Sequence, residues 1–144
     1  MKLKTKTRIL CGCGSVVSLV ILVLCGSIFY MTRDGRIAKD PEKIADEAGF
    51  DLPAYTIVSK FDNMERHTSA WSNYTWKLQL KKPLSEKDIK NLKKLVEKNA
   101  KWTYNPDNHT YDYHSEENER YLSITIDAVE GKVTMDYEWL DFLA

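Results

Sequence analysis

A stretch of 23 uncharged residues near the N-terminus, residues 9–31, constrains this chain more than any other feature. Twelve of these residues are Leu, Ile, Val or Phe, and four of the eight residues before the stretch are basic. As a helix the stretch measures roughly 35 Å, which is enough to cross a hydrocarbon core of about 30 Å. At about −0.3 to −0.6 kcal/mol for each large apolar residue, its insertion is favoured by roughly 5 kcal/mol. We therefore expect a basic flank over residues 1–8 and a transmembrane helix over residues 9–31.

Two other interpretations of this segment stay open. A cleaved signal peptide also begins with basic residues, but its apolar core is only about 7 to 15 residues long and ends in small residues. Here the core is longer, and Cys25 and Ser27 are the best small pair near its end. A lipid-anchored protein needs a small residue directly before the modified cysteine, whereas Cys25 follows the bulky Leu24. The favoured interpretation is an uncleaved single-pass signal-anchor, and secretion or lipid anchoring after processing is the alternative.

The distribution of basic residues sets the expected orientation. Four basic residues precede the apolar stretch within a very short N-terminus, which favours a cytoplasmic start and places residues 32–144 outside the cytoplasm. These 113 residues contain no cysteine and hence no disulfide, but they are numerous enough to bury a core without one. We expect a polar linker over residues 32–40 and one extracytoplasmic domain of the cell envelope over residues 41–144.

Two helices are predicted in this domain. The first begins after Asp40, a good N-cap, and ends before Gly49, which suits the left-handed conformation at a helix end. The second covers residues 86–99 and begins with a capping box formed by Ser85 and Asp88. Its expected buried stripe comprises Ile89, Leu92, Leu95 and Val96.

Alternation of polar and apolar residues predicts the strands. In the first strand this alternation places Tyr55, Ile57 and Phe61 on one face and Lys60 on the other. Faces as regular as these are typical of antiparallel sheets that are packed on one side. We expect an α+β fold with an antiparallel sheet of about five strands, the long helix packed on one face and a short N-terminal helix. The alternating segments are residues 54–61, 70–81, 102–104, 110–114, 120–127 and 133–139.

The densest group of polar and aromatic residues lies in a predicted hairpin, residues 102–120. It contains carboxylate and imidazole side chains, which ligate transition metals, but it lacks a strict spacing such as His-x-x-x-His. We therefore expect no metal and no cofactor. Trp71, which has polar neighbours on its strand face, is a candidate sugar-stacking residue, although aromatic residues at strand spacing more often form cross-strand pairs. The polar-aromatic candidates are Trp71, Asp107, His109, Asp112 and His114.

Motifs for catalysis are missing from the sequence. It has no Gly-x-Ser-x-Gly motif, no glycine-rich phosphate loop and no cysteine outside the apolar stretch. We therefore expect no catalytic residue.

The charges of the domain are unevenly distributed. Residues 77–101 contain nine lysines and three acidic residues, whereas residues 102–144 contain two basic and ten acidic residues. Five lysines recur at helical spacing: Lys87, Lys90, Lys94, Lys98 and Lys101. This stripe is either a solvated face or a contact for an acidic partner or lipid headgroups. Nucleic acid is not an expected partner, because the stripe lacks the arginine forks that recognise bases.

Two functions are consistent with these patterns. The first is a membrane-anchored, non-catalytic module that binds a protein partner. The alternative is a small membrane-tethered enzyme, or a metal- or carbohydrate-binding protein, that uses the hairpin of residues 102–120. A cleft in which a carboxylate and a histidine converge favours the alternative, and a filled helix–sheet interface favours the binding module.

Overall fold

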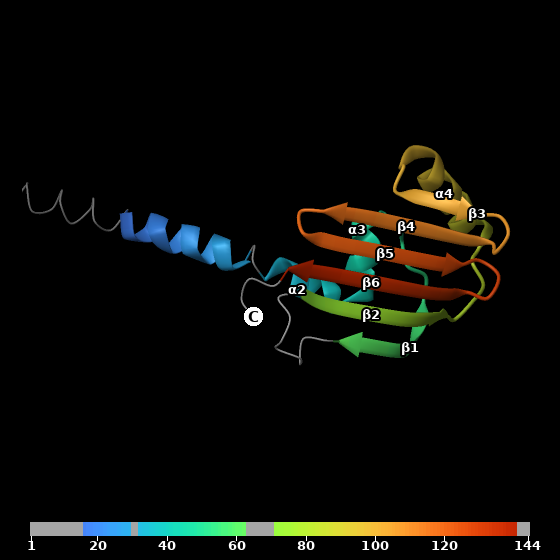
Figure 1. Cartoon of the computed structure of the whole chain (residues 1–144), viewed down its shortest axis with the longest axis horizontal. Coiled ribbons are helices and arrows are strands. Elements are labelled where there is room, and N and C mark those ends of the chain that lie inside the picture. Colours follow the sequence, from blue (N-terminus) through green and yellow to red (C-terminus); the bar gives the residue numbers. More distant parts are fainter. Residues whose placement is uncertain (1–15, 30–31, 63–70, 141–144) are drawn as a thin grey trace, which may run out of the picture. The chain divides into compact units, whose positions relative to one another are not determined.

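The computed structural model describes residues 16–29, 32–62 and 71–140 (Figure 1). The chain divides into two compact units, Met1–Arg33 and Asp34–Ala144. The first unit contains a helix, and the second contains the folded domain.

The helix of the first unit covers residues 16–29, and its large apolar side chains are exposed. Within the described ranges, no helix is both long enough and apolar enough to cross a membrane. The predicted basic flank, residues 1–8, and residues 9–15 and 30–31 of the predicted span lie outside those ranges. The transmembrane helix therefore stays a prediction.

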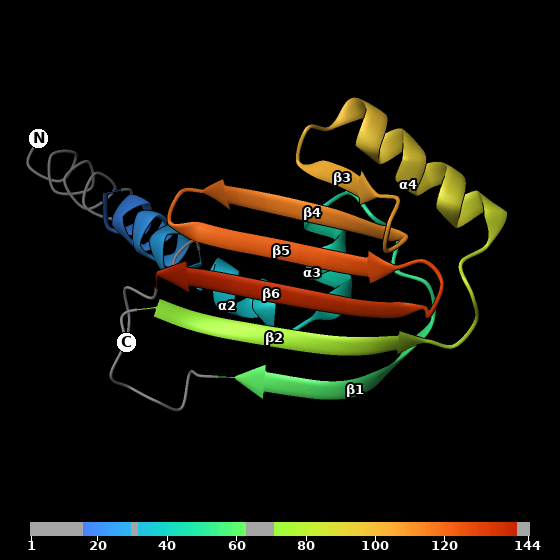
Figure 2. The same cartoon turned by 45° about the vertical axis from the view of Figure 1, so that its right-hand side comes forward.

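The folded domain contains a six-stranded antiparallel sheet with the order β1-β2-β6-β5-β4-β3 (Figure 2). The α+β class and the antiparallel sheet are confirmed, with six strands where about five were predicted. The short β3 corresponds to the predicted segment 102–104; it pairs with β4 along its whole length and forms one edge of the sheet. The strands are β1 (Tyr55–Asp62), β2 (Trp71–Leu80), β3 (Trp102–Asn105), β4 (Thr110–Glu117), β5 (Arg120–Asp127) and β6 (Lys132–Leu140).

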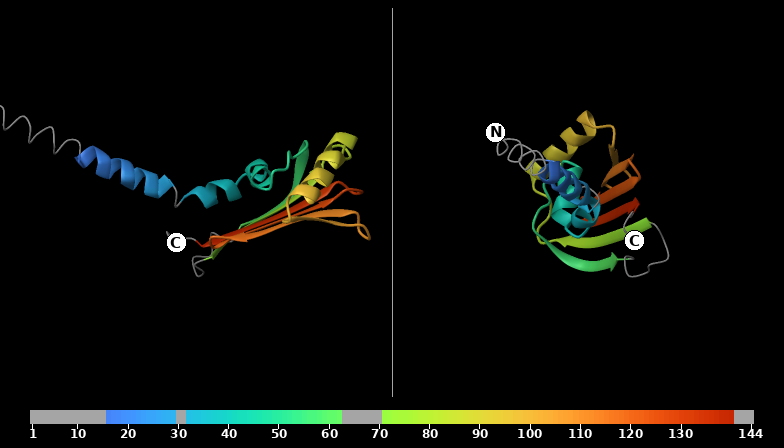
Figure 3. Two further views of the ribbon diagram at one scale, coloured as in Figure 1. Left: turned by 90° about the horizontal axis from the view of Figure 1, so that it is seen from above. Right: turned by 90° about the vertical axis from the view of Figure 1, so that its left-hand side faces the viewer.

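Three labelled helices are α2 (Arg33–Ala38), α3 (Pro41–Glu47) and α4 (Glu86–Lys98). In the domain they lie on the same side of the sheet, with α4 next to β3 (Figure 3). The predicted linker, residues 32–40, contains α2. Both predicted N-caps begin helices. Asp40 Oδ1 accepts a hydrogen bond from the Glu42 amide, and Ser85 and Asp88 form the capping box.

The core lies between this face of the sheet and the helices. Alternate residues of the strands point into it. Two buried tryptophans also donate hydrogen bonds to backbone carbonyl oxygens at the C-terminal ends of helices. Trp76 Nε1 donates to the carbonyl oxygen of Ala38, at the end of α2, over 2.8 Å. Trp102 Nε1 donates to the carbonyl oxygen of Ala48, the C-cap of α3, over 2.9 Å. Each indole thus satisfies a carbonyl that the helix leaves without an intrahelical partner.

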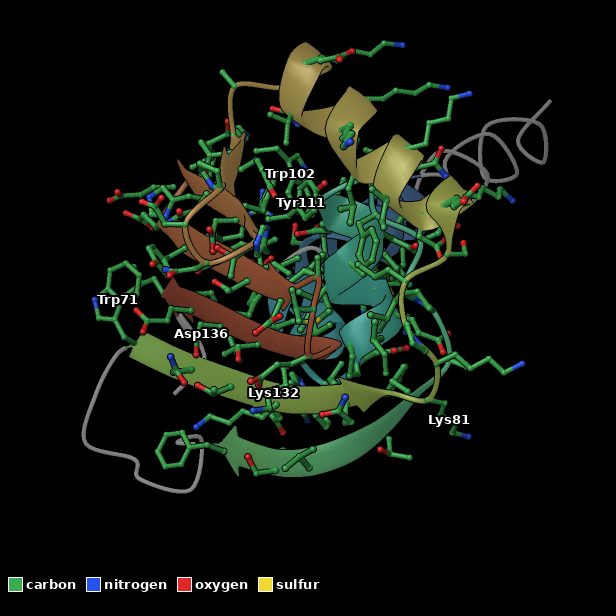
Figure 4. All side chains as sticks on the ribbon, turned by 90° about the vertical axis from the view of Figure 1, so that its right-hand side faces the viewer. Trp71, Lys81, Trp102, Tyr111, Lys132 and Asp136 are labelled. Carbon is green, nitrogen blue, oxygen red and sulfur yellow. The ribbon has the colours of Figure 1, made fainter. Side chains whose placement is uncertain are left out.

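The side chains on the other face of the sheet are mostly polar. No helix lies over this face within the described part of the chain (Figure 3). Lys132 and Asp136 of β6 lie on this side, whereas Trp102 and Tyr111 point toward the helices (Figure 4). Thr75 Oγ1 donates a hydrogen bond to Asp136 Oδ1 over 2.6 Å across β2 and β6. Such cross-strand pairs stabilise the exposed face without apolar burial.

The predicted faces of β1 are wrong at its C-terminal end. An irregularity between Ile57 and Ser59 shifts the register, so Lys60 pairs with Trp76 and Phe61 pairs with Thr75. Phe61 therefore lies on the polar face with 53% of its surface exposed. Lys60 takes the inner position, with Nζ 4.9 Å from the ring centroid of Tyr74. One extra residue in a strand exchanges the faces of all residues after it.

Candidate interaction surface

Helix α4 turns its apolar stripe toward the domain. Leu92 is fully buried, and Ile89, Leu95 and Val96 pack partly buried against the core, as predicted. Five lysines of α4 are exposed, and four of them recur at the predicted spacing on the side opposite the apolar stripe. We call these four the α4 lysine face: Lys87, Lys90, Lys94 and Lys98. Among the ion pairs of the described residues, none includes a lysine of this face. Its positive charge is thus presented to solvent.

Lys101, the fifth lysine of the predicted stripe, has a different environment. It follows α4, is partly buried, and its Nζ donates a hydrogen bond to Glu117 Oε1 of β4 over 2.5 Å. This bond raises the pKa of Lys101 and lowers the pKa of Glu117. Because its charge is already balanced by Glu117, Lys101 does not belong to the α4 lysine face.

A groove of about 230 Å³ runs beside α4. One wall is the loop that follows α3, and the other wall is α4 itself. Its volume is below the roughly 300–1,000 Å³ of typical small-molecule sites, so its size suits one or two side chains. We call this feature the α4 groove and define it by Phe50, Asp51, Asn91, Lys94, Leu95 and Lys98.

Two of the polar-aromatic candidates, Asp112 and His114, share the outer face of β4, as the sequence predicts. Asp112 accepts hydrogen bonds from Thr110 Oγ1 over 2.9 Å and from Thr125 Oγ1 over 2.8 Å. His114 makes an edge contact with the ring of Tyr121, with 5.0 Å between centroids. These contacts hold both side chains on a solvated sheet face.

The remaining candidates lie at opposite ends of the sheet. Asp107 and His109 occupy the turn between β3 and β4, where His109 Nδ1 is 3.1 Å from the Tyr104 hydroxyl. Trp71 pairs with Leu140 at the other end, where β4 continues into β5. The predicted patch is therefore not one site. Within the described ranges, no three side chains of His, Cys, Asp or Glu are grouped as metal ligands, and the expectation of no metal stays a prediction.

A polar cluster that the sequence did not indicate joins α2 and α3 to the sheet. Arg120 Nη1 lies 3.3 Å from Asp34 Oδ1 and 3.6 Å from Glu47 Oε1. Tyr137 donates its hydroxyl hydrogen to Asp34 Oδ1 over 2.9 Å. Burial, followed by the nearby carboxylates Glu47 and Asp34, raises the pKa of Tyr137 above its usual value. We call these residues the Arg120 cluster.

No spacing rule connects the four residues of the Arg120 cluster, because they lie far apart in the sequence and on four different elements. The arginine balances two carboxylates, and the tyrosine hydroxyl lies within hydrogen-bonding distance of both, 2.9 Å from Asp34 Oδ1 and 3.5 Å from Glu47 Oε2. This arrangement holds helices against the sheet. The lysines of the α4 lysine face, in contrast, are exposed to solvent.

Comparison of the chain with models of protein families, with curated proteins and with solved structures gives no match. The geometry and charge of the α4 lysine face and the α4 groove are therefore the basis for a functional proposal.

Proposed function

We propose that this protein is a membrane-anchored, non-catalytic module whose domain binds an acidic partner protein through the α4 lysine face. The observation that carries the proposal is that four lysines share one exposed helix face without an ion pair among the described residues. Exposed charges contribute only about 0 to 1 kcal/mol per pair to folding. They do orient a partner of opposite charge and accelerate its association.

The membrane anchor in this proposal is the apolar segment of residues 9–31, with the domain outside the cytoplasm. Its length and its lack of charge support the anchor. The test is carbonate extraction of membranes followed by intact-mass measurement. We expect the full-length chain to stay in the membrane pellet. A mass that begins near residue 26 or 28, or release by carbonate alone, contradicts the anchor and favours processing.

The arrangement of polar side chains supports a binding role over catalysis. Asp112 and His114 are engaged by neighbours on an open sheet face, and Trp71 lies at the other end of the sheet from His109. A hydrolytic or metal-dependent site requires such groups to converge in a cleft that excludes water. No observation favours the alternative use of the hairpin.

The binding experiment compares two double variants that change the net charge equally. Lys90→Glu with Lys94→Glu reverses the α4 lysine face, and Lys39→Glu with Lys77→Glu reverses exposed lysines elsewhere in the domain. Full-length tagged proteins are used to capture partners from detergent-solubilised membranes at several salt concentrations. We expect the α4 variant alone to lose about tenfold or more in affinity, about 1.4 kcal/mol, together with most of its salt dependence.

Equal capture by the two double variants contradicts the proposal. A parallel measurement uses vesicles with and without anionic lipid. If reversal of the α4 lysine face abolishes binding to anionic vesicles and leaves protein capture unchanged, the face contacts lipid headgroups instead. Turnover by the purified chain that a single His114→Ala or Asp112→Asn substitution abolishes contradicts the non-catalytic role.

A further inference from the structure

We propose that the α4 groove holds an apolar side chain from an extended acidic segment of the partner, while carboxylates of that segment pair with Lys94 and Lys98. This inference rests on the proposed binding of an acidic protein at α4. It adds the kind of segment that is recognised: short, extended, acidic, and with one apolar anchor.

The dimensions of the groove fit such a segment. Its lining from α4 extends from Asp88 to Lys98, which is about 15 Å at the helical rise per residue. An extended chain advances about 3.3 Å per residue, so four or five residues cover this length. The volume of about 230 Å³ then accommodates one large side chain from the segment.

The apolar part of the groove is formed by Phe50 and Leu95. Phe50 is held in place, because its amide bonds the carbonyl oxygen of Ala45 over 3.0 Å and its ring makes an edge contact with Trp102. Gly49 precedes it with a φ of +73°, a left-handed conformation that glycine adopts without strain. The loop wall is thus preformed, which lowers the ordering cost of binding.

The charges along the groove select the orientation of an acidic segment. The carboxylate of Asp88, at the N-terminal end of α4, is engaged by the amide and hydroxyl of Ser85 over 3.0 and 2.6 Å. Lys94 and Lys98 lie toward the C-terminal end and are exposed. Carboxylates of the partner are therefore attracted to the C-terminal half of the groove and disfavoured near Asp88 and Asp51.

The test uses the full-length chain in zwitterionic detergent micelles and an array of pentapeptides, Asp-Glu-X-Asp-Glu, with every amino acid at X. We expect Leu, Ile, Met and Phe at X to bind about tenfold or more tightly than Gly at X. Asn91→Trp fills the groove and removes this preference. Glu97→Trp adds the same side chain at an exposed position of α4 outside the groove and keeps the preference. Asp51→Trp fills the groove from its other wall, so the test can still be made if one of the two groove-filling variants fails to fold.

Four outcomes contradict one or both of the proposals. Salt-dependent binding of all acidic peptides, without a preference at X, contradicts the groove and leaves the α4 lysine face in place. A preference at X that survives both groove-filling variants also contradicts the groove. Equal binding of the acidic array and an array in which Lys replaces each Asp and Glu contradicts both proposals, as does the absence of any binding.

Discussion

Removal of Arg120 is the sharpest test of how the helices are held on the sheet. In the Arg120 cluster, the side chains of Arg120, Asp34 and Glu47 are only 22 to 24% exposed. Arg120→Met keeps much of the apolar stem but leaves the two carboxylates near each other without the guanidinium group between them. Both carboxylates have lost much of their hydration in the folded state, whereas they regain it when the chain unfolds.

The expected loss of stability follows from this degree of burial. Breaking a fully buried ion pair by removing one partner costs about 3 to 5 kcal/mol, and breaking an exposed pair costs about 0 to 1 kcal/mol. With roughly a quarter of each side chain exposed, we expect Arg120→Met to cost about 2 kcal/mol. Neutralising the carboxylates as well, with Asp34→Asn and Glu47→Gln, is expected to recover about half of this loss, because amides do not repel each other.

The assay is urea unfolding of the full-length chain in zwitterionic micelles, followed by the fluorescence of the buried residues Trp76, Trp102 and Trp139. Lys132→Met is the matched control, because the pair of Lys132 with Glu130 is 65% and 55% exposed. We expect the control to change the unfolding free energy by less than about 0.5 kcal/mol. If Arg120→Met costs no more than Lys132→Met, or if neutral amides recover nothing, the cluster does not hold the helices in the way we describe.

Three further predictions concern the packing of α4 and the pH dependence of folding. Leu92→Asp places a charge at a fully buried position and should destabilise the domain by about 3 kcal/mol or more; a melting temperature within a degree of wild type refutes the packing of α4. Ser85→Ala removes the side-chain acceptor of the Asp88 amide and should cost about 1 kcal/mol in the same urea assay, so an unchanged midpoint contradicts the cap. The pKa of Tyr137 is raised above 10.0, so the folded state keeps a proton that the unfolded state loses above pH 10. Stability contributed by this hydroxyl is complete below pH 10 and falls by about 1.4 kcal/mol per pH unit above it. Tyr137→Phe should flatten this decline, and identical slopes in alkaline urea titrations contradict the assignment.

Elements whose signals lie within a few neighbouring residues could be predicted from the sequence. The capping box of α4 depends on Ser85 and Asp88, three positions apart, and the end of α3 depends on Gly49. Hydrophobic spacing likewise predicted that Leu92 is buried and that most of the lysine stripe is exposed. These predictions succeeded because hydrogen bonding and amphipathicity within one helix are local properties.

Predictions failed where partners from other elements decide the outcome. Phe61 was expected to share a face with Tyr55 and Ile57, but the irregularity near Val58 exists only in the pairing of β1 with β2. Lys101 has the correct helical spacing for the lysine stripe, yet Glu117 of β4 pairs with its charge. The helix α2 was missed in a polar segment, since Trp76 and the Arg120 cluster stabilise it from the sheet. A helix of this length has little stability of its own.

The features of the candidate site likewise divide into those that the local sequence predicted and those that tertiary packing decided. The amino-acid sequence by itself determined an uncharged segment long enough to span a bilayer, an α+β pattern and a basic face on the long helix, because each depends on composition or on a short period. Only the tertiary structure decided that the loop after α3 lies beside α4 and forms a groove with Leu95 and Lys98. It also decided that Asp34, Glu47, Arg120 and Tyr137 meet. Contacts between residues that are distant in the chain depend on how the sheet and helices pack, and no local spacing encodes that packing.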